Sequence, residues 1–247
     1  MPSICARCSG VTFDAMDIAF VTCLHKRSWL SSLWYGHTVQ FGSVHAACTI
    51  GDEDNANIAA RHGSSIACEN LPLGRKHNAA LALAMQADWQ AMMVCPSDDF
   101  VSPAYVEAAT AAIAAGANYV FPMSCGLFDV ATGQACVLRH EPRRGWLMFG
   151  AGRMLSRRAA EAIGPLWTDD KNKGLDTDSH VRILAHGFKP TFVDVDGVCL
   201  TDVKTDDNLW PYRTWAHRPG VRSSDADGVL GHVSDDVRQA LLSARRA

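Results

Sequence analysis

Apolar runs and amphipathic segments alternate along the first half of the chain. The runs DIAFVTC (residues 17–23) and SVHAACTI (43–50) predict buried strands, as do 64–68 and 89–95. Residues 28–35, 75–87 and 102–115 have helical patterns, and a short helix is expected after Asp54, up to Gly63; Ser28 and Ser102 are at N-cap positions and Gly63 is at a helix stop. Strands that alternate with helices predict an α/β fold with a mainly parallel central sheet flanked by helices.

The second half of the sequence is less regular. Strands are expected at 118–123 and 134–138, helices at 156–163, 177–186 and 234–246, and one bent strand or a strand pair at 191–200. Residues 108–128 carry no formal charge, and their change from Ala-rich to β-branched and aromatic predicts a helix and a buried strand, with no transmembrane segment. We expect one domain over 1–247, divided into two halves (17–115 and 116–205) and a C-terminal extension (206–247).

The composition is that of a globular protein with free thiols. The 247 residues are 48% hydrophobic and 20% charged, with a net charge of −3, which indicates a globular chain and argues against broad nucleic-acid affinity. Nine cysteines, several of them in expected strands, predict free thiols and a reducing, cytoplasmic location. The Cys5-Ala-Arg-Cys8 pair is either a zinc site or part of a loose N-terminal arm.

Polar clusters follow three of the expected strands, at 24–27, 51–54 and 97–99. Ligands of parallel α/β sheets bind beyond the carboxyl ends of the strands, so these clusters predict a site. Asp98 and Asp99 repel each other unless a cation or a donor offsets their charge, and Mg²⁺ or Mn²⁺ is one such cation. The alternative is a solvated turn with a helix cap.

Other polar residues admit a functional and a structural interpretation. Asp52 can accept hydrogen bonds from a base or ribose, or be a turn acid. Lys76 and Asn78 open a helix after Gly74, a position that suits a diphosphate, although both can be ordinary helix-surface residues. Asp176, in a Gly-Leu-Asp-Thr-Asp segment, can be a general base or a helix cap.

Five segments in this order resemble family 2 glycosyltransferases of the GT-A fold. They are IAFVTCLHKR (18–27), CTIGDED (48–54), LPLGRKHNAALALA (71–84), MVCPSDDFVSP (93–103) and GLDTDSHVRILAHGFKP (174–190). The resemblance implies an inverting transferase that uses a nucleotide-diphosphate sugar, with a UDP-sugar favoured, and a divalent metal, Mn²⁺ or Mg²⁺. It makes 17–115 the nucleotide-sugar-binding half and 116–205 the acceptor half.

The resemblance also implies residue roles. Asp52 would contact the nucleotide base, Lys76 would lie near the diphosphate, and Asp176 would be the catalytic base. Asp98 and Asp99 would serve the ribose and the metal. The sequence departs from the family where Pro96 and Leu175 replace acids, and Asp202 lies near the place of a metal-binding histidine, as a candidate third ligand.

The acceptor is a hydroxyl on a glycan, a small molecule or a hydroxylated DNA base. Segments 139–158 and 210–218 mix cations with aromatics, which suits phosphates, bases or sugars. Two other functions stay open. A nucleotidyltransferase that makes a nucleotide-sugar would need a Gly-rich phosphate loop, and residues 24–28 hold no glycine. A non-catalytic nucleotide-binding module is compatible with Pro96 and Leu175.

Overall fold

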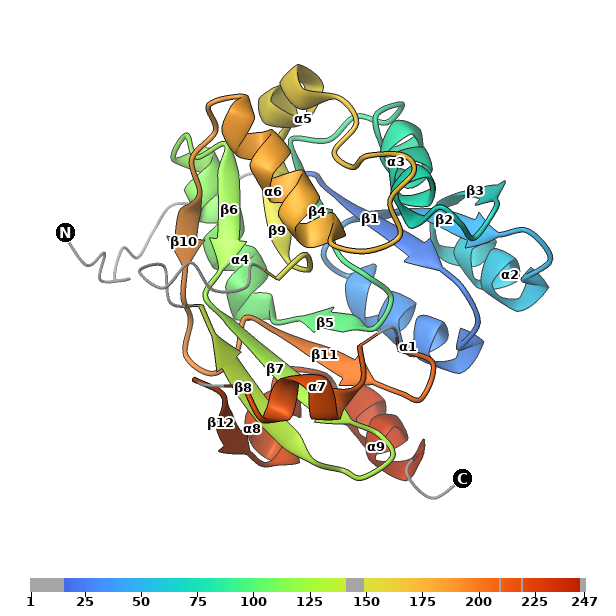
Figure 1. The fold of residues 1–247 in the computed structure, drawn as a ribbon, viewed down its shortest axis with the longest axis vertical. Coiled ribbons are helices and arrows are strands. Elements are labelled where there is room, and N and C mark those ends of the chain that lie inside the picture. The colour runs from blue at the N-terminus through green and yellow to red at the C-terminus, as the bar shows by residue number, and fades with distance from the viewer. Residues whose placement is uncertain (1–15, 141–148, 209, 219, 245–247) are drawn as a thin grey trace.

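The computed structural model describes residues 16–140, 149–208, 210–218 and 220–244. These residues form two sheets, with the smaller sheet below the larger one in Figure 1. The Cys5–Cys8 pair and residues 141–148, which include Trp146 and two arginines of the Arg-rich segment, lie outside the described residues.

The large sheet has seven strands in the order β10-β6-β9-β4-β1-β2-β3. Pairings within β1–β4 are parallel, whereas β9 runs antiparallel to both β4 and β6. Its strands are β1 (Ile18–Leu24), β2 (Ser43–Thr49), β3 (Ser64–Cys68), β4 (Ala91–Val94), β6 (Tyr119–Pro122), β9 (Arg153–Ser156) and β10 (Thr191–Val193). The sheet is therefore mostly parallel, as the sequence predicts.

Helices cover both faces of this sheet because successive strand side chains point to opposite sides. Ala19 and Val21 of β1 pack in one core with residues of α3 (Leu73–Ala84), α5 (Arg157–Ile163) and α6 (Leu175–Ala185). Phe20 of β1 packs in the other core with α1 (Ser28–Thr38), α2 (Glu53–His62) and α4 (Pro103–Ala114). This three-layer arrangement leaves the carboxyl edge of the strands open to carry polar loops.

The second sheet has five strands in the order β12-β8-β7-β11-β5. It comprises β5 (Asp99–Val101), β7 (Ser124–Asp129), β8 (Ala135–Arg139), β11 (Leu200–Lys204) and β12 (Arg222–Ser224), with α7 (Tyr212–Ala216), α8 (Ala226–Leu230) and α9 (Asp235–Ser243) against it. Only the β7–β11 pairing is parallel among its described pairings.

The sequence does not predict this second sheet. Two of its strands, β5 and β12, have only three residues each, too few for an apolar period to be recognised. The expected strand or strand pair at 191–200 is instead β10 and β11, which belong to different sheets. The charge-free stretch 108–128 does form the end of a helix followed by buried strands, α4, β6 and most of β7.

Two other expectations concern the described residues. No helix among them is both long and apolar enough to cross a membrane. The cysteines of this part of the chain carry free thiols, as predicted. A cytoplasmic location stays a prediction.

Candidate active site

The cavity at the candidate active site lies at the connection between β4 of the large sheet and β5 of the small sheet. Asp99 begins β5, and the antiparallel pairing of β5 with β11 places Asp202 directly opposite it. Like charges that face each other across a strand pair repel. The fold therefore builds a carboxylate pair from positions that are about a hundred residues apart in sequence.

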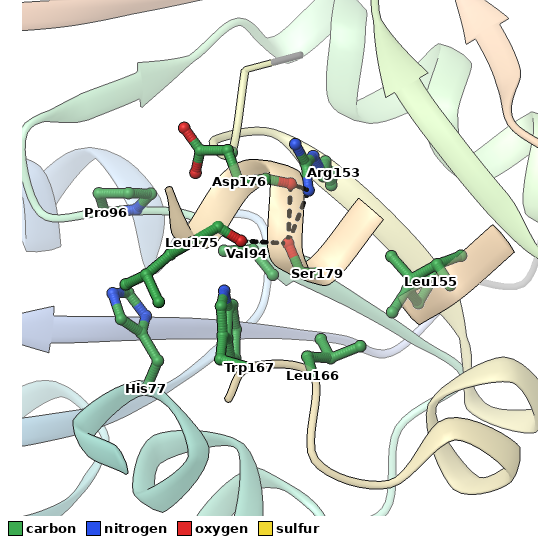
Figure 2. A pocket seen from close by; sticks show the side chains of 12 residues that line it. His77, Val94, Pro96, Arg153, Leu155, Leu166, Trp167, Leu175, Asp176 and Ser179 are labelled. Atoms are coloured by element: carbon green, nitrogen blue, oxygen red, sulfur yellow. Dashed lines mark hydrogen bonds between the residues drawn. The ribbon is translucent and has the colours of Figure 1, made fainter. Parts of the chain in front are cut away.

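Asp99 and Asp202 share a cavity of about 120 Å³ with Asp176. The other lining residues are Pro96, Cys125, Leu127, Leu138, Phe149, Gly150, Ala151 and Trp215. A second cavity of about 90 Å³ has an apolar floor that includes Leu166 and Trp167, and it shares Pro96, Gly150 and Asp176 with the first (Figure 2). Asp176 thus lies on the boundary between a carboxylate-lined space and an apolar one.

Asp176 is held from three sides at the first turn of α6. Arg153 donates to the Asp176 backbone carbonyl at 2.7 Å and to the Ser179 hydroxyl at 2.7 Å, as the dashed lines in Figure 2 show. The Gly150 backbone N–H donates to the carboxylate, and a Cβ at Gly150 would stand 1.9 Å from the Asp176 Oδ1. Only glycine leaves room for the carboxylate in this position.

The pKa of Asp176 is raised above its ordinary value because its carboxylate loses water in the cavity. The positive charge of Arg153 and the Gly150 hydrogen bond offset part of that rise. A carboxylate with a raised pKa is a stronger base than an ordinary one, which is what the removal of a hydroxyl proton requires.

Asp98, Asp99, Asp176 and Asp202 are called the acidic cluster below. Asp98 accepts hydrogen bonds from Arg27 at 2.9 Å and from the Asn208 amide at 2.8 Å. Burial favours its protonated form, but the charges of Arg27 and Lys204 outweigh burial and lower its pKa. Asp98 is therefore ionised, and protein side chains already bond to its carboxylate.

Among the described residues, no donor or cationic side chain bonds directly to the Asp99 carboxylate. Burial raises its pKa well above the ordinary range, and the neighbouring carboxylates of Asp202 and Asp98 raise it further. Asp202 forms an ion pair through Oδ2 with Lys204, while its Oδ1 is buried and has no hydrogen-bond partner. Burial also raises the pKa of Asp202, against the opposing charge of Lys204.

Lys204 is 6% exposed and lies at the end of β11. Burial lowers the pKa of a lysine, yet the carboxylates of Asp202 and Asp98 reverse this and raise it above the ordinary value. Among the described residues, Asp202 is the one hydrogen-bond or ion-pair partner of its ammonium group. The Lys204 ammonium is thus protonated, and not all of its N–H donors have an acceptor among the described residues.

Asp52 lies outside this cavity and stabilises the loop after β1. Its Oδ2 accepts from the Lys26 backbone N–H at 2.6 Å and from the Asn55 amide at 2.9 Å, and it caps α2. These bonds lower its pKa in spite of burial. They also hold Lys26 and Arg27 in left-handed backbone conformations, with φ of 55° and 46°, which L side chains rarely adopt. The loop links Asp52 to the acidic cluster, because Arg27 binds Asp98.

Lys76 is 1% exposed, contrary to its interpretation as a surface residue. Its ammonium donates to the Leu24 carbonyl at 2.6 Å, to the Thr49 hydroxyl at 2.6 Å and to the Asn70 side chain at 3.0 Å. All three N–H donors therefore have protein acceptors. Contact with a diphosphate stays a prediction, and it requires Lys76 to release one of these partners.

Asn78 also bonds to protein atoms. Its amide donates to the Trp167 carbonyl at 2.7 Å and to Asp169 at 2.8 Å, and its carbonyl accepts from the Trp167 N–H. It joins α3 to the segment before α6, and its donor-binding role stays a prediction.

Sequence reasoning missed Lys204 and Asn208, and it included Arg27 and Arg153 only as members of the segments 24–27 and 139–158, without a role of their own. Lys204 left a signal: Asp202 and Lys204 are two apart in a strand, so they share a face. The role of Arg153 left none, since only the fold brings it beneath Asp176.

The acidic cluster does not fit a ready-made divalent-metal site. Among the described residues, no group of three or more His, Cys, Asp or Glu side chains is arranged to hold a metal ion. Arg27 binds Asp98 and Lys204 binds Asp202. Of these three neighbouring carboxylates, Asp99 is therefore the one that forms no ion pair with a described residue. The expected metal ligands Asp98 and Asp99 are adjacent, but their carboxylates have different environments. Metal binding stays a prediction of the resemblance.

Comparisons with known proteins bear on the fold. No protein-family model matches the sequence, and no curated protein matches it. Residues 1–349 of S. aureus TarS superpose with a TM-score of 0.54 at 12% identity, over 93% of this chain and 70% of that one. A longer S. aureus TarS structure gives a TM-score of 0.52 at 10% identity, and the match spans 76% of this chain but 37% of that one. At these identities the likeness shows a shared mixed α/β fold.

Proposed function

We propose that the protein transfers a sugar from a nucleotide-diphosphate donor to a hydroxyl acceptor with inversion of the anomeric carbon. The single observation that carries this proposal is the convergence of Asp99, Asp176 and Asp202 on one cavity at the carboxyl edge of the sheet. The fold supports it, because TarS is a GT-A-like glycosyltransferase. The order of sequence motifs supports it independently.

In the proposed reaction, the acceptor oxygen attacks the anomeric carbon from the face opposite the leaving group. The new O–C bond forms while the bond from that carbon to the diphosphate oxygen breaks, and the electron pair leaves with the nucleoside diphosphate. Asp176 takes the hydroxyl proton, a role that suits its raised pKa. One displacement inverts the configuration, and no covalent enzyme intermediate forms.

The other residues of the cavity bind and orient. Arg153 and Gly150 hold the base. Leu127, Leu138 and Trp215 line the same cavity with apolar surface, which excludes water from the attack and suits the flat face of a sugar or a base. A UDP-sugar is the favoured donor. Glycans, small molecules and hydroxylated DNA bases are the acceptor classes to test.

A product assay tests the proposal. The protein is incubated with a panel of nucleotide-sugars and hydroxyl acceptors, and in parallel with nucleoside triphosphates and sugar phosphates. Glycosyl transfer releases free nucleoside diphosphate together with a glycosylated acceptor. Release of pyrophosphate instead would identify a nucleotidyltransferase, and neither product would indicate a binding module. Salt-sensitive binding to duplex DNA would favour a DNA acceptor, and no binding at low salt would exclude one.

A further inference from the structure

Of the three cations beside the acidic cluster, Lys204 has the fewest hydrogen-bond partners among the described residues. Arg27 is bound to Asp98 and Asn208. Arg153 is bound to the backbone carbonyls of Phe149 and Asp176 and to the Ser179 hydroxyl, although its Nη2 is buried without a partner. The Lys204 ammonium has one partner among the described residues, Asp202. An ammonium has three N–H donors, so two remain for a ligand.

The position of Lys204 is central to the cluster. Its charge acts on Asp98, Asp99 and Asp202, and it also acts on Asp176 across the cavity. Asp202, to which it is paired, lines that cavity. Lys204 is not one of the lining residues itself, but its ion pair with Asp202 places the ammonium directly behind the cavity wall, next to the space that a diphosphate would occupy.

A divalent cation would compete with this lysine. To bind Asp202 through both oxygens, it would have to displace the ammonium or share the carboxylate with it, and two cations on one carboxylate repel each other. The unpartnered Oδ1 of Asp202 leaves one acceptor, and Asp99 opposite it can supply a hydrogen-bond donor when protonated.

We propose that Lys204 is the cation that binds the donor diphosphate, so that donor binding and transfer need no divalent metal. This inference rests on the proposed function. As the bond between the sugar and the diphosphate breaks, negative charge grows on the leaving oxygen, and the Lys204 ammonium stabilises it through hydrogen bonds. Lys204 stays protonated throughout, and the acceptor proton goes to Asp176.

The test measures binding of UDP and of uridine by calorimetry, with EDTA or with Mn²⁺, and donor hydrolysis under the same conditions. GDP, CDP and ADP are measured in parallel. The wild-type protein is expected to bind its nucleoside diphosphate in EDTA within about twofold of its affinity in Mn²⁺. Lys204→Met should weaken diphosphate binding at least about tenfold, as loss of a charged hydrogen bond does, and leave nucleoside binding within about twofold. Lys204→Arg should keep most of the affinity.

Two further variants keep the test sharp. Lys204→Met leaves Asp202 buried without a counter-charge, so the double variant Asp202→Asn/Lys204→Met removes both charges and preserves folding. It should bind the diphosphate as weakly as Lys204→Met does. Lys189→Met, at an exposed lysine, is the matched control and should behave like the wild type.

The outcomes separate the two proposals. If EDTA abolishes diphosphate binding by the wild-type protein, the role of Lys204 as the sole cation is wrong, whatever the variants do. Unchanged diphosphate binding by Lys204→Met and by the double variant is equally contradictory. If no nucleoside diphosphate binds under any condition, the proposed function itself fails and this inference fails with it.

Discussion

Two buried lysines, Lys76 and Lys204, illustrate two uses of a positive charge within one fold. Lys76 lies under the loop after β1 and donates to a backbone carbonyl, a hydroxyl and a side-chain amide. Burial lowers its pKa, and the thiols around it do not compensate. Lys204 is buried to a similar degree, yet carboxylates raise its pKa and only one of them bonds to it directly.

The two lysines differ in how many of their N–H donors lack a protein acceptor: all three of Lys76 have one, and the described residues supply one partner for Lys204. Lys76, Asp52 and Asn78 each bond to protein atoms, although the neighbouring His25 Nδ1, Asn55 Oδ1 and His77 Nδ1 are buried without a hydrogen-bond partner among the described residues. Within the described residues, the acidic cluster differs in the charge of its unpartnered groups: the Asp99 carboxylate has no cationic side chain bonded to it, Asp202 Oδ1 is unbonded, and Lys204 beside them has spare donors. Buried charged groups without full sets of partners cost stability, so their gathering around one cavity points to a ligand.

Asp176→Asn should give the largest effect, because it removes the proposed base from the cluster and preserves its shape. We expect the transfer rate to fall by about a thousandfold, within the range typical of general-base catalysis, while donor affinity changes by less than about twofold. Single-turnover kinetics and calorimetry measure the two quantities.

Asp178→Asn is the control for this substitution. Asp178 is on the same helix, but its carboxylate bonds to the Thr168 N–H at 2.7 Å and to Lys171, outside the cavity. Its variant should keep wild-type turnover. Wild-type turnover by Asp176→Asn would contradict the base assignment.

Lys76→Met tests whether Lys76 stabilises the fold. Removing the ammonium leaves the Leu24 carbonyl, the Thr49 hydroxyl and the Asn70 side chain without their donor, and we expect a loss of about 3 kcal/mol in the free energy of unfolding. For a chain of this size, that loss lowers Tm by about 6–12 °C. Differential scanning calorimetry measures it.

The donor affinity of Lys76→Met decides between the two roles of this lysine. If Lys76 is structural, the folded fraction binds the donor with wild-type affinity. A large loss of affinity at unchanged Tm would instead restore the sequence-based prediction that Lys76 contacts the diphosphate.

The sequence predicts the large sheet well because its signal is local. The runs that become β1, β2 and β4 are apolar and long enough to recognise, and the acids that follow them mark the edge that holds the cavity. Asp99, which follows β4, is predicted in this way, whereas Asp176 is predicted from its motif and the family resemblance; the two share the cavity.

The remainder of the site depends on long-range pairing. β5 has three residues, and its pairing with β11 sets Asp202 against Asp99 through a register that no local pattern specifies. The three acceptors of Lys76 come from β1, β2 and the segment after β3, so its burial is a tertiary property. Sequence periodicity predicts which face a side chain occupies, but not which acceptors meet it there.

The pH dependence of transfer should distinguish the cavity carboxylate Asp176 from Asp178, which lies on the same helix and bonds to Thr168 and Lys171. The pKa of Asp176 is raised by burial, and the base must be deprotonated, so kcat/KM should fall about tenfold for each pH unit below that pKa. The acid limb should therefore begin above about pH 4, the ordinary range of an aspartate. Hydrogen bonds outweigh burial and lower the pKa of Asp178, and Asp178→Asn should leave this limb unchanged. If kcat/KM instead falls only at or below about pH 4, the ordinary pKa range of an aspartate, Asp176 is not the titrating base.

Asp99→Asn should give the smallest effect, and an increase in stability. Because burial and the charges of Asp202 and Asp98 raise the folded-state pKa of Asp99, its contribution to stability is fully present below the unfolded-state pKa of about 4. That contribution is lost as pH rises through the folded-state value. The amide cannot ionise, so Asp99→Asn should raise Tm at pH 7–8 by about 2–4 °C, or about 1 kcal/mol, and the gain should shrink towards pH 4. Thermal unfolding across pH measures this, with the exposed Asp88→Asn as a control that should show no such trend. A gain that is absent at neutral pH, or that grows as pH falls, would show that Asp99 carries no uncompensated charge in the folded protein.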